Sequence, residues 1–221
     1  MNQHIVITGA NRGIGLELVR QWQAAGNTVT ALCRTASDEL KDTGARIIED
    51  VDVTDEDSLP RVRRKLGDQK IDILYNNAGL LTDESLHDMN WDRIQTQFEV
   101  NTLGPLKVTL AFLDLIREGG KVALMTSRMG SIADNDSGGR YGYRMTKAAL
   151  NAAGKSLAED LKPRGIAVAI LHPGFVKTAM TGYNGHITPD VAAQRLIERV
   201  DELTLETSGV FRHSDGSELP W

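Results

Sequence analysis

The sequence predicts an α/β protein: a single domain over residues 1–221, built on a doubly wound parallel sheet of about seven strands with helices on both faces. Three observations predict this class. Short apolar runs alternate with segments of helical periodicity, no internal repeat or linker interrupts them, and a glycine-rich turn joins the first run to the first helical segment. A chain of 221 residues, 41% of them hydrophobic, is long enough to bury one core.

The first half supplies four of the predicted strands. They are the apolar runs at 4–8, 28–33, 46–53 and 71–75. Ile14, Leu18 and Trp22 recur at helical spacing after the first run, up to Gly26. A charged helix follows the third run and ends near Leu66.

The second half supplies the remaining elements. Helical periodicity covers 91–117, with a possible break near 101–105, where the sequence reads NTLGP. Further strands are predicted at 121–127, 166–171 and 208–212, and further helices at 143–162 and 189–203.

Composition argues against several classes of partner. The net charge of −5, with no block of Lys or Arg, argues against a nucleic-acid surface. Cys33 is the only cysteine, so an intrachain disulfide is impossible, and the five histidines show no ligand spacing, so we expect no metal site and surface or loop positions for the histidines. No signal-like start and no long apolar run appear, so we expect a cytoplasmic protein without a membrane partner.

The glycine-rich turn is the first candidate binding element. The segment TGANRGIG at 8–15 places glycines at 9, 13 and 15 between a strand and a helix. Missing side chains let a backbone approach a pyrophosphate, and a helix that begins near Gly13 offers free N–H groups. The spacing differs from GxGxxG, but its context is the one that dinucleotide binding requires. The alternative is a plain turn between strand and helix.

The end of the second strand predicts which dinucleotide binds. An NAD enzyme usually carries an acid there for the ribose 2′-hydroxyl, whereas this chain has Cys33 followed by Arg34. Arg34, helped by Arg12 in the glycine turn, could pair with a 2′-phosphate. We therefore predict NADP(H), the alternative being that both arginines are simply solvated.

Tyr143 and Lys147 are the candidate acid/base pair. Four residues apart on a predicted helix, they lie on one face, whereas Tyr141 points to another side. A neighbouring cation favours the phenolate and so lowers the pKa of a tyrosine toward a useful range. A tyrosine and a lysine at this spacing are more often a solvated surface pair, so the remaining motifs decide between the two readings.

Polar groups at other predicted strand ends belong to the same edge of the sheet. Asp52 could accept a hydrogen bond from an adenine amino group, and the NNAG segment at 76–79 suits a strand end beside a flat ligand. Ser127 could bond a substrate oxygen, or could cap a turn. The segment HPGFVKT at 172–178 forms a second glycine turn.

These motifs, in this order over the whole chain, resemble the classical short-chain dehydrogenase/reductase family, whose fold is Rossmann-like. More narrowly, the segments at 127–131, 141–147 and 215–221 resemble the C-factor and sniffer-type carbonyl reductases. The resemblance implies that Tyr143 donates a proton to a carbonyl oxygen while the nicotinamide delivers hydride to carbon. It further implies that Lys147 holds the nicotinamide ribose and lowers the pKa of Tyr143, that Ser127 polarises the carbonyl, and that Asn101 keeps a water that links Lys147 to solvent.

The residue patterns and the resemblance together predict a set of cofactor contacts. These are Gly9, Asn11, Arg12, Gly13, Ile14, Gly15, Arg34, Asp52, Val53, Asn76, Ala78, Gly79, Tyr143, Lys147, Pro173, Gly174, Val176 and Thr178.

The leading hypothesis is an NADPH-dependent reductase of a carbonyl compound, an aldehyde, ketone or quinone. A nucleotide-binding signalling or regulatory protein of C-factor type is the alternative, and a sugar-nucleotide epimerase fits the glycine spacing poorly. The segment at 181–188 is short for a substrate cover, so the pocket is expected to be open. Helices rich in small residues suggest a homodimer or homotetramer.

Overall fold

The computed structural model describes residues 2–55 and 57–221, and its centre is a seven-stranded sheet. The order is β3-β2-β1-β4-β5-β6-β7, and all neighbouring strands are parallel. The strands are β1 His4–Thr8, β2 Thr28–Leu32, β3 Arg46–Ile48, β4 Ile71–Asn76, β5 Ile116–Met125, β6 Ala167–His172 and β7 Phe211–His213. The predicted fold class is confirmed.

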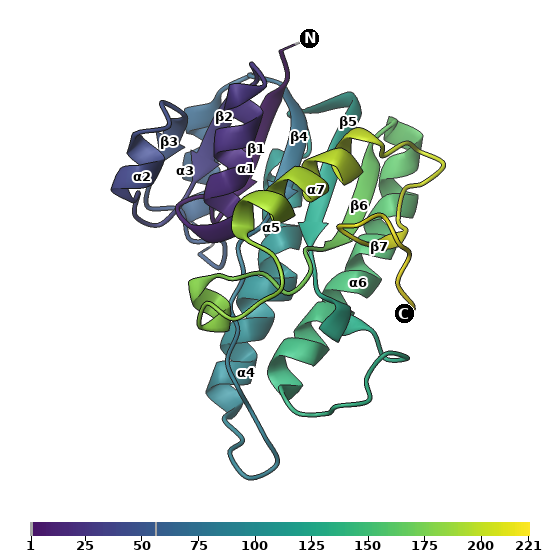
Figure 1. Cartoon of the computed structure of the whole chain (residues 1–221). Helices are drawn as coiled ribbons and strands as arrows, with labels where there is room; N and C mark the ends of the chain where they lie inside the picture. Colours follow the sequence, from purple (N-terminus) through teal and green to yellow (C-terminus); the bar gives the residue numbers. More distant parts are fainter. Residues whose placement is uncertain (1, 56) are drawn as a thin grey trace.

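The helices cover both faces of this sheet (Figure 1). They are α1 Gly13–Ala24, α2 Asp38–Lys41, α3 Ser58–Leu66, α4 Trp91–Phe98, α5 Gly104–Phe112, α6 Tyr141–Leu161 and α7 Pro189–Asp201. A π-helical segment, Glu99–Leu103, joins α4 to α5, and short 3₁₀ turns occupy Arg128–Gly130, Lys162–Arg164 and Ala179–Thr181.

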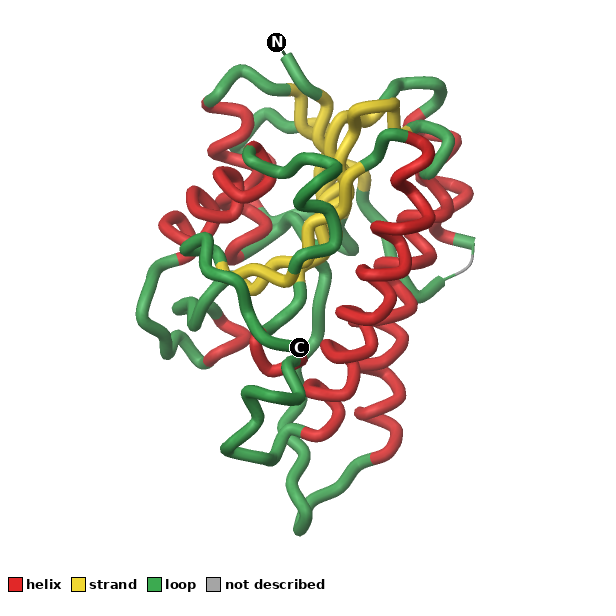
Figure 2. Tube along the Cα trace, turned by 90° about the vertical axis from the view of Figure 1, so that its right-hand side faces the viewer, coloured by secondary structure: helices red, strands yellow, loops and turns green. Residues whose placement is uncertain are grey.

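The side chains of each central strand alternate between two hydrophobic cores. In β1, Val6 enters the core beneath α3, α5 and α6, whereas Ile5 and Ile7 enter the core beneath α1 and α7, and all three are fully buried. Figure 2 shows the resulting three layers, with the strands between helices on either side. A strand that is buried on both faces has a continuous apolar sequence, which is why these strands could be predicted from the sequence.

The main departures from the predicted elements have local causes. The third strand ends at Ile48 rather than at residue 53, because Asp50 takes a left-handed backbone conformation at φ 59° and turns the chain. The periodicity over 91–117 divides into α4, the π-helical segment and α5, and β5 already begins at Ile116. The last strand begins at Phe211 instead of 208.

The parallel topology brings the ends of the strands to one edge. The loops that follow β1, β4, β5 and β6 all leave from the carboxyl edge, and the loop between β4 and α4 reaches furthest from the sheet (Figure 1). Ligands of open α/β sheets bind in crevices at this edge. The fold therefore places the candidate residues of four separate segments on one side of the molecule.

A test of the packing between α6 and the sheet uses Gly154. A Cβ added there would lie 2.9 Å from Cδ1 of both Ile170 and Leu124. We expect Gly154→Val to lower the free energy of unfolding by about 1–3 kcal/mol, because the added volume overfills the core. Urea denaturation measures this change. Ala152→Val, on the exposed face of the same helix, should change stability by less than about 0.5 kcal/mol, and equal losses would contradict this packing.

Candidate active site

The site is built on the contact between α6 and the end of β5. Lys147 is 3% exposed, and its Nζ donates a 2.7 Å hydrogen bond to the carbonyl oxygen of Met125. One turn further along the helix, Asn151 accepts a 2.6 Å bond from the Thr126 hydroxyl. A Cβ on Gly130 would lie 2.7 Å from the backbone of Lys147, so the turn after β5 packs directly on the helix.

This contact brings Ser127 and Tyr143 together. Ser127 lies two residues after the end of β5, close enough to the Tyr143 phenol to act on its pKa, and its hydroxyl accepts from the Met129 N–H at 3.1 Å. Burial raises the pKa of Tyr143 above its ordinary value, while Ser127 and the nearby positive charge of Arg140 oppose that rise. The phenol therefore keeps its proton at neutral pH, beside a second hydroxyl. This is the geometry of a proton donor paired with a hydrogen-bond donor.

Lys147 lies beside the tyrosine ring. Its Nζ is 5.6 Å from the ring centroid of Tyr143, and burial lowers the pKa of the lysine to about 7. The groups that oppose the rise in the pKa of the phenol are Ser127 and Arg140, and the lowering of that pKa by Lys147 stays a prediction. The ammonium of Lys147, which burial destabilises, is held by its hydrogen bond to the Met125 carbonyl.

Asn101 occupies the π-helical segment next to this pair. It is fully buried, its Oδ1 accepts from the Leu80 N–H at 2.8 Å, and its Nδ2 donates to the Leu80 carbonyl and to the Thr146 hydroxyl at 2.8 and 3.1 Å. Gly79 lies between the two polar groups: a Cβ there would be 3.5 Å from Asn101 Oδ1 and 3.9 Å from Lys147 Nζ. Single π turns inside α-helices are frequent at functional sites.

The glycine turn has the close approach that a pyrophosphate needs. A Cβ on Gly15 would lie 2.3 Å from the carbonyl oxygen of Gly9 and 2.6 Å from Asn77 Nδ2, so no side chain fits. Asn77 ties the turn to β4 by donating to the carbonyls of Thr8 and Gly9 at 3.1 and 3.0 Å. The Thr8 hydroxyl in return accepts from the backbone N–H groups of Asn77 and Ala78.

The start of α1 fits an anionic group. The helix begins at Gly13, its first turn holds no acidic residue, and no side chain caps it, so its first N–H groups are free to bind an anion. Arg12 and Arg34 are both exposed beside this turn, and the Ser37 hydroxyl donates to the carbonyl of Asn11 at 2.7 Å. The residues present therefore fit the phosphates of a dinucleotide.

The second glycine turn faces the first one. Gly174 has φ 94°, and a Cβ on Gly13 would lie 3.4 Å from Cγ2 of Thr178. Val176 is buried and pairs with Ile187, which ties the segment after Pro173 to the chain ahead of α7. The two turns therefore lie next to one another at the carboxyl edge of the sheet, where ligands of this fold class bind.

Two sequence-predicted positions are directed elsewhere. Asn76 is 2% exposed and donates to the Thr109 hydroxyl of α5, so its side chain is turned away from the glycine turn that Asn77 contacts. The Asp52 carboxylate accepts from the N–H and hydroxyl of Thr54, and these bonds hold the pKa of Asp52 below its usual range. Val53 is buried against Gly104 at the start of α5.

Sequence reasoning missed the histidines near this edge. His172 and His213, at the ends of β6 and β7, form an edge-to-face pair with ring centroids 4.9 Å apart, and burial lowers the pKa of His172 to about 3. His4 is also buried and bonds the Lys70 carbonyl and the Thr30 hydroxyl, so the expectation of surface or loop positions was wrong for these residues. All three histidines lie at an end of a predicted strand, and this position was the sequence signal that could have indicated their burial.

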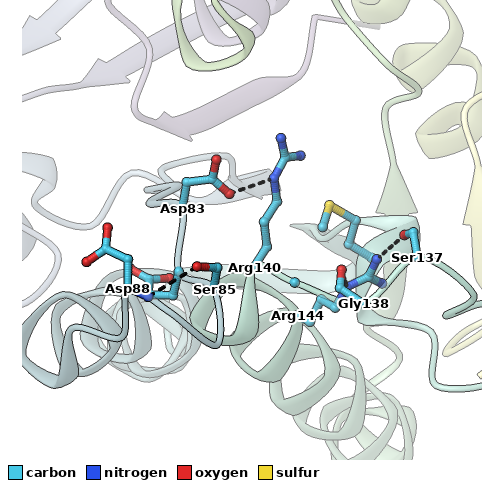
Figure 3. Close-up of a pocket in the computed structure, with 10 residues that line it drawn as sticks. Asp83, Ser85, Asp88, Ser137, Gly138, Arg140 and Arg144 are labelled. Carbon is cyan, nitrogen blue, oxygen red and sulfur yellow. Dashed lines mark hydrogen bonds and ion pairs between the residues drawn. The ribbon is translucent and has the colours of Figure 1, made fainter.

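A polar cavity of about 470 Å³ opens at the start of α6, the helix that carries Tyr143. It lies between the loop that follows β4 and the loop that precedes α6, and Arg140 and Arg144 project from its α6 side (Figure 3). Met129, two residues after Ser127, also lines it. Arg140 and Arg144 were not singled out from the sequence; Arg140 precedes α6 as its left-handed N-cap, and Arg144 lies in the first turn of the helix.

Two further observations concern metals and membranes. Over residues 2–55 and 57–221, no three His, Cys, Asp or Glu side chains gather closely enough to hold a metal ion. None of the helices in the described part of the chain combines the length and apolar character needed to cross a bilayer.

Comparison with known proteins identifies the family. The family model described as short chain dehydrogenase matches residues 3–186. The chain belongs to this family of oxidoreductases. A 1-hydroxy-2-glutathionyl-2-methyl-3-butene dehydrogenase from Rhodococcus sp. (strain AD45) is 40% identical, with 98% of this chain and 99% of the relative aligned. The C-signal protein of Myxococcus xanthus is 42% identical over 68% of this chain and 93% of its own length.

Solved structures of short chain dehydrogenases share the whole architecture. The carbonyl reductase Sniffer of D. melanogaster superposes with a TM-score of 0.91 at 30% identity, and 100% of both chains is covered. An NADPH-bound carbonyl reductase from chicken fatty liver superposes with a TM-score of 0.90 at 27% identity over 100% of this chain and 99% of the other. The resemblance to the C-factor and sniffer-type proteins is therefore confirmed.

The buried Lys147 makes a prediction about pH and stability. In the folded protein the pKa of Lys147 is about 7, whereas an unfolded lysine titrates near pH ~10.4. Between these values the unfolded chain binds the extra proton, so raising the pH stabilises the folded state through this group. We expect the free energy of unfolding of the native protein to rise from pH 7.5 to 9.5 by up to about 1.4 kcal/mol per pH unit relative to Lys147→Met.

Urea denaturation at several pH values measures that slope. Lys155→Met, which removes an exposed lysine of the same helix, should keep the slope of the native protein. Parallel pH dependences for the native protein and Lys147→Met would show that Lys147 stays charged in the folded state.

Proposed function

We propose that this short chain dehydrogenase is an NADP(H)-dependent oxidoreductase that interconverts a carbonyl compound and its alcohol. The observation that carries the proposal is that Ser127 lies near the Tyr143 phenol and that buried Lys147 lies beside the tyrosine ring, at the sheet edge that also holds both glycine turns. Hydride addition to a carbonyl carbon leaves negative charge on its oxygen, and a proton donor with a second hydroxyl stabilises that charge.

In the reductive direction, NADPH supplies the hydride when bound. Tyr143 donates its proton to the carbonyl oxygen, which completes the alcohol and leaves a phenolate. Ser127 donates a hydrogen bond to the same oxygen. Lys147, whose pKa near 7 leaves it partly charged at neutral pH, stabilises the phenolate from beside the ring. Asn101, bonded to Leu80 and Thr146, is a positioning residue that keeps the loop after β4 against α6.

The cofactor would be held by residues at both glycine turns. The glycine turn and the first N–H groups of α1 fit the pyrophosphate, and the exposed guanidinium groups of Arg34 and Arg12 suit a 2′-phosphate. Val176 and Thr178 would contact the carboxamide of the nicotinamide, as the family resemblance implies, and Thr178 lies beside Gly13 of the glycine turn. The NADPH-bound reductase from chicken supports this choice of cofactor.

The relatives support two candidate roles. The Rhodococcus relative is named as a dehydrogenase of an alcohol that carries a glutathionyl group, and the Sniffer protein as a carbonyl reductase, so both directions of one reaction are represented. The Myxococcus relative is named C-signal, which keeps a signalling role open as the second candidate. We favour catalysis because a protein that only binds the nucleotide has no need of a buried Lys147 next to Tyr143.

Tyr143→Phe tests the proton donor. We expect it to lower kcat for NADPH oxidation with a panel of aldehydes, ketones and quinones about 10²- to 10⁴-fold, because the hydroxyl that protonates the product is lost. Absorbance at 340 nm follows the reaction. Tyr141→Phe, two residues away on another side of α6, is the matched control and should keep its activity. Tight NADPH binding without turnover on any carbonyl would favour the signalling role.

Arg34→Asp tests the choice of cofactor. We expect the ratio of kcat/KM for NADPH to that for NADH to fall about 10- to 100-fold, because a charge-assisted hydrogen bond to the 2′-phosphate is replaced by repulsion. Steady-state kinetics with both cofactors measure the ratio. Arg64→Asp, an exposed arginine of α3, makes the same change in net charge and should leave the ratio as it is. An unchanged ratio in Arg34→Asp would assign 2′-phosphate recognition to other residues.

A further inference from the structure

The polar cavity at the start of α6 is lined by sequence neighbours of the two proposed catalytic hydroxyls. Met129 lies two residues after Ser127, Arg144 directly follows Tyr143 on α6, and Arg140 precedes the helix as its N-cap. The charge of Arg140 is close enough to the Tyr143 phenol to act on its pKa. A volume of about 470 Å³ is within the range of small-molecule sites. The cavity therefore lies next to the two chain segments that carry Ser127 and Tyr143.

Arg144 is the unpaired cation of the cavity. It is half-buried, and its guanidinium donates only to neutral oxygens, the Ser137 hydroxyl at 2.8 Å and the Gly138 carbonyl at 3.3 Å (Figure 3). The charge of Arg144 helps to lower the pKa of Asp134, but that carboxylate forms its ion pair with Arg128. Among residues 2–55 and 57–221, no carboxylate forms an ion pair with Arg144. A guanidinium without a carboxylate partner at the wall of an open cavity has N–H donors with which it can bind an anionic ligand.

The acidic residues around the cavity are largely committed elsewhere. Asp83 pairs with Arg140 at 3.1 Å, so these two charges offset one another. Glu84 is 1% exposed, and its carboxylate accepts bonds from Gln97 and the Thr82 hydroxyl beneath the start of α6. Asp88 is exposed on the opposite wall. The wall formed by α6 thus presents a free positive charge, and the far wall presents a negative one.

We propose that this cavity binds a carboxylate carried by the substrate, and that Arg144 is the residue that selects substrates of this class. The inference rests on the proposed oxidoreductase function, because it places the reacting carbonyl at Tyr143. Arg144 would bind the carboxylate with guanidinium N–H groups that face the cavity. Asp88, on the other wall, would disfavour negative charge there and so direct the carboxylate toward α6.

Matched aldehydes test the proposal. Hexanal is neutral, and 4-oxobutanoate and 6-oxohexanoate are anionic aldehydes of two lengths. We expect the native protein to have a higher kcat/KM for at least one oxo acid than for hexanal. Arg144→Gln should lower kcat/KM for that oxo acid about 10- to 100-fold more than for hexanal, since it removes a charge-assisted bond. Arg144→Lys should restore part of the difference, and Asp88→Asn should raise kcat/KM for the oxo acid.

Lys155→Gln is the control for net charge. It removes one positive charge from the exposed end of the same helix, where Lys155 pairs with Glu159, and should leave the preference between substrates unchanged. An equal loss for hexanal and the oxo acids in Arg144→Gln, or no preference in the native protein, would overturn the proposal.

Binding without turnover separates this inference from the proposed function. Adipate, a dicarboxylate without a carbonyl to reduce, is titrated calorimetrically into the NADP⁺ complex of each variant. We expect Arg144→Gln to weaken adipate binding at least tenfold, and Tyr143→Phe to retain it. Adipate binding that depends on Arg144 in a protein that reduces no aldehyde would contradict the reductase and support the anion site. Equal binding by the native protein and Arg144→Gln would reject the anion site, whatever the activity.

Discussion

The burial of the Lys147 ammonium against the end of β5 is the constraint on which the site depends. A buried ammonium without partners is costly, so its bond to the Met125 carbonyl fixes the distance between α6 and the strand. Ser127 leaves β5 two residues later, and Tyr143 precedes Lys147 by one helical turn. One contact thus sets the relative positions of both hydroxyls. The same burial lowers the pKa of Lys147. Burial therefore determines both where this lysine lies and how readily it loses its proton.

The rest of the fold positions the parts of the site that this contact does not reach, which are the two glycine turns and the loop after β4. Parallel strands end at one edge, so the glycine turn after β1 and the turn after β6 face one another although they are far apart in the sequence. Asn77 bonds the glycine turn to the end of β4, and Asn101 bonds the loop after β4 to α6 through Thr146. The end of β4 therefore connects the glycine turn, which would bind the cofactor, to the helix that carries Tyr143 and Lys147. Each half of the sheet supplies part of the site, so neither half could form it alone.

Much of this arrangement follows from sequence periodicity. The buried strands, the glycine turn and the spacing of Tyr143 and Lys147 depend on local patterns, and the parallel sheet converts them into one edge. Other features depend on partners distant in sequence. Whether Asn76 or Asn77 meets the glycine turn depends on the face that each strand residue takes, and the effect of Lys147 on the phenol depends on how deeply both are buried. Arg140 takes a left-handed conformation that favours glycine, so no local rule predicted its place.

The π-helical segment Glu99–Leu103 limits which insertions and deletions the chain can accept. A π turn holds one more residue than an α turn, so deletion of a single residue here would remove the π turn, but Pro105 would still prevent α4 and α5 from joining as one regular helix. The deletion would rotate everything on one side by about 100° and carry Asn101 away from Leu80. A homologue one residue shorter at this position must therefore hold its β4 loop by other means.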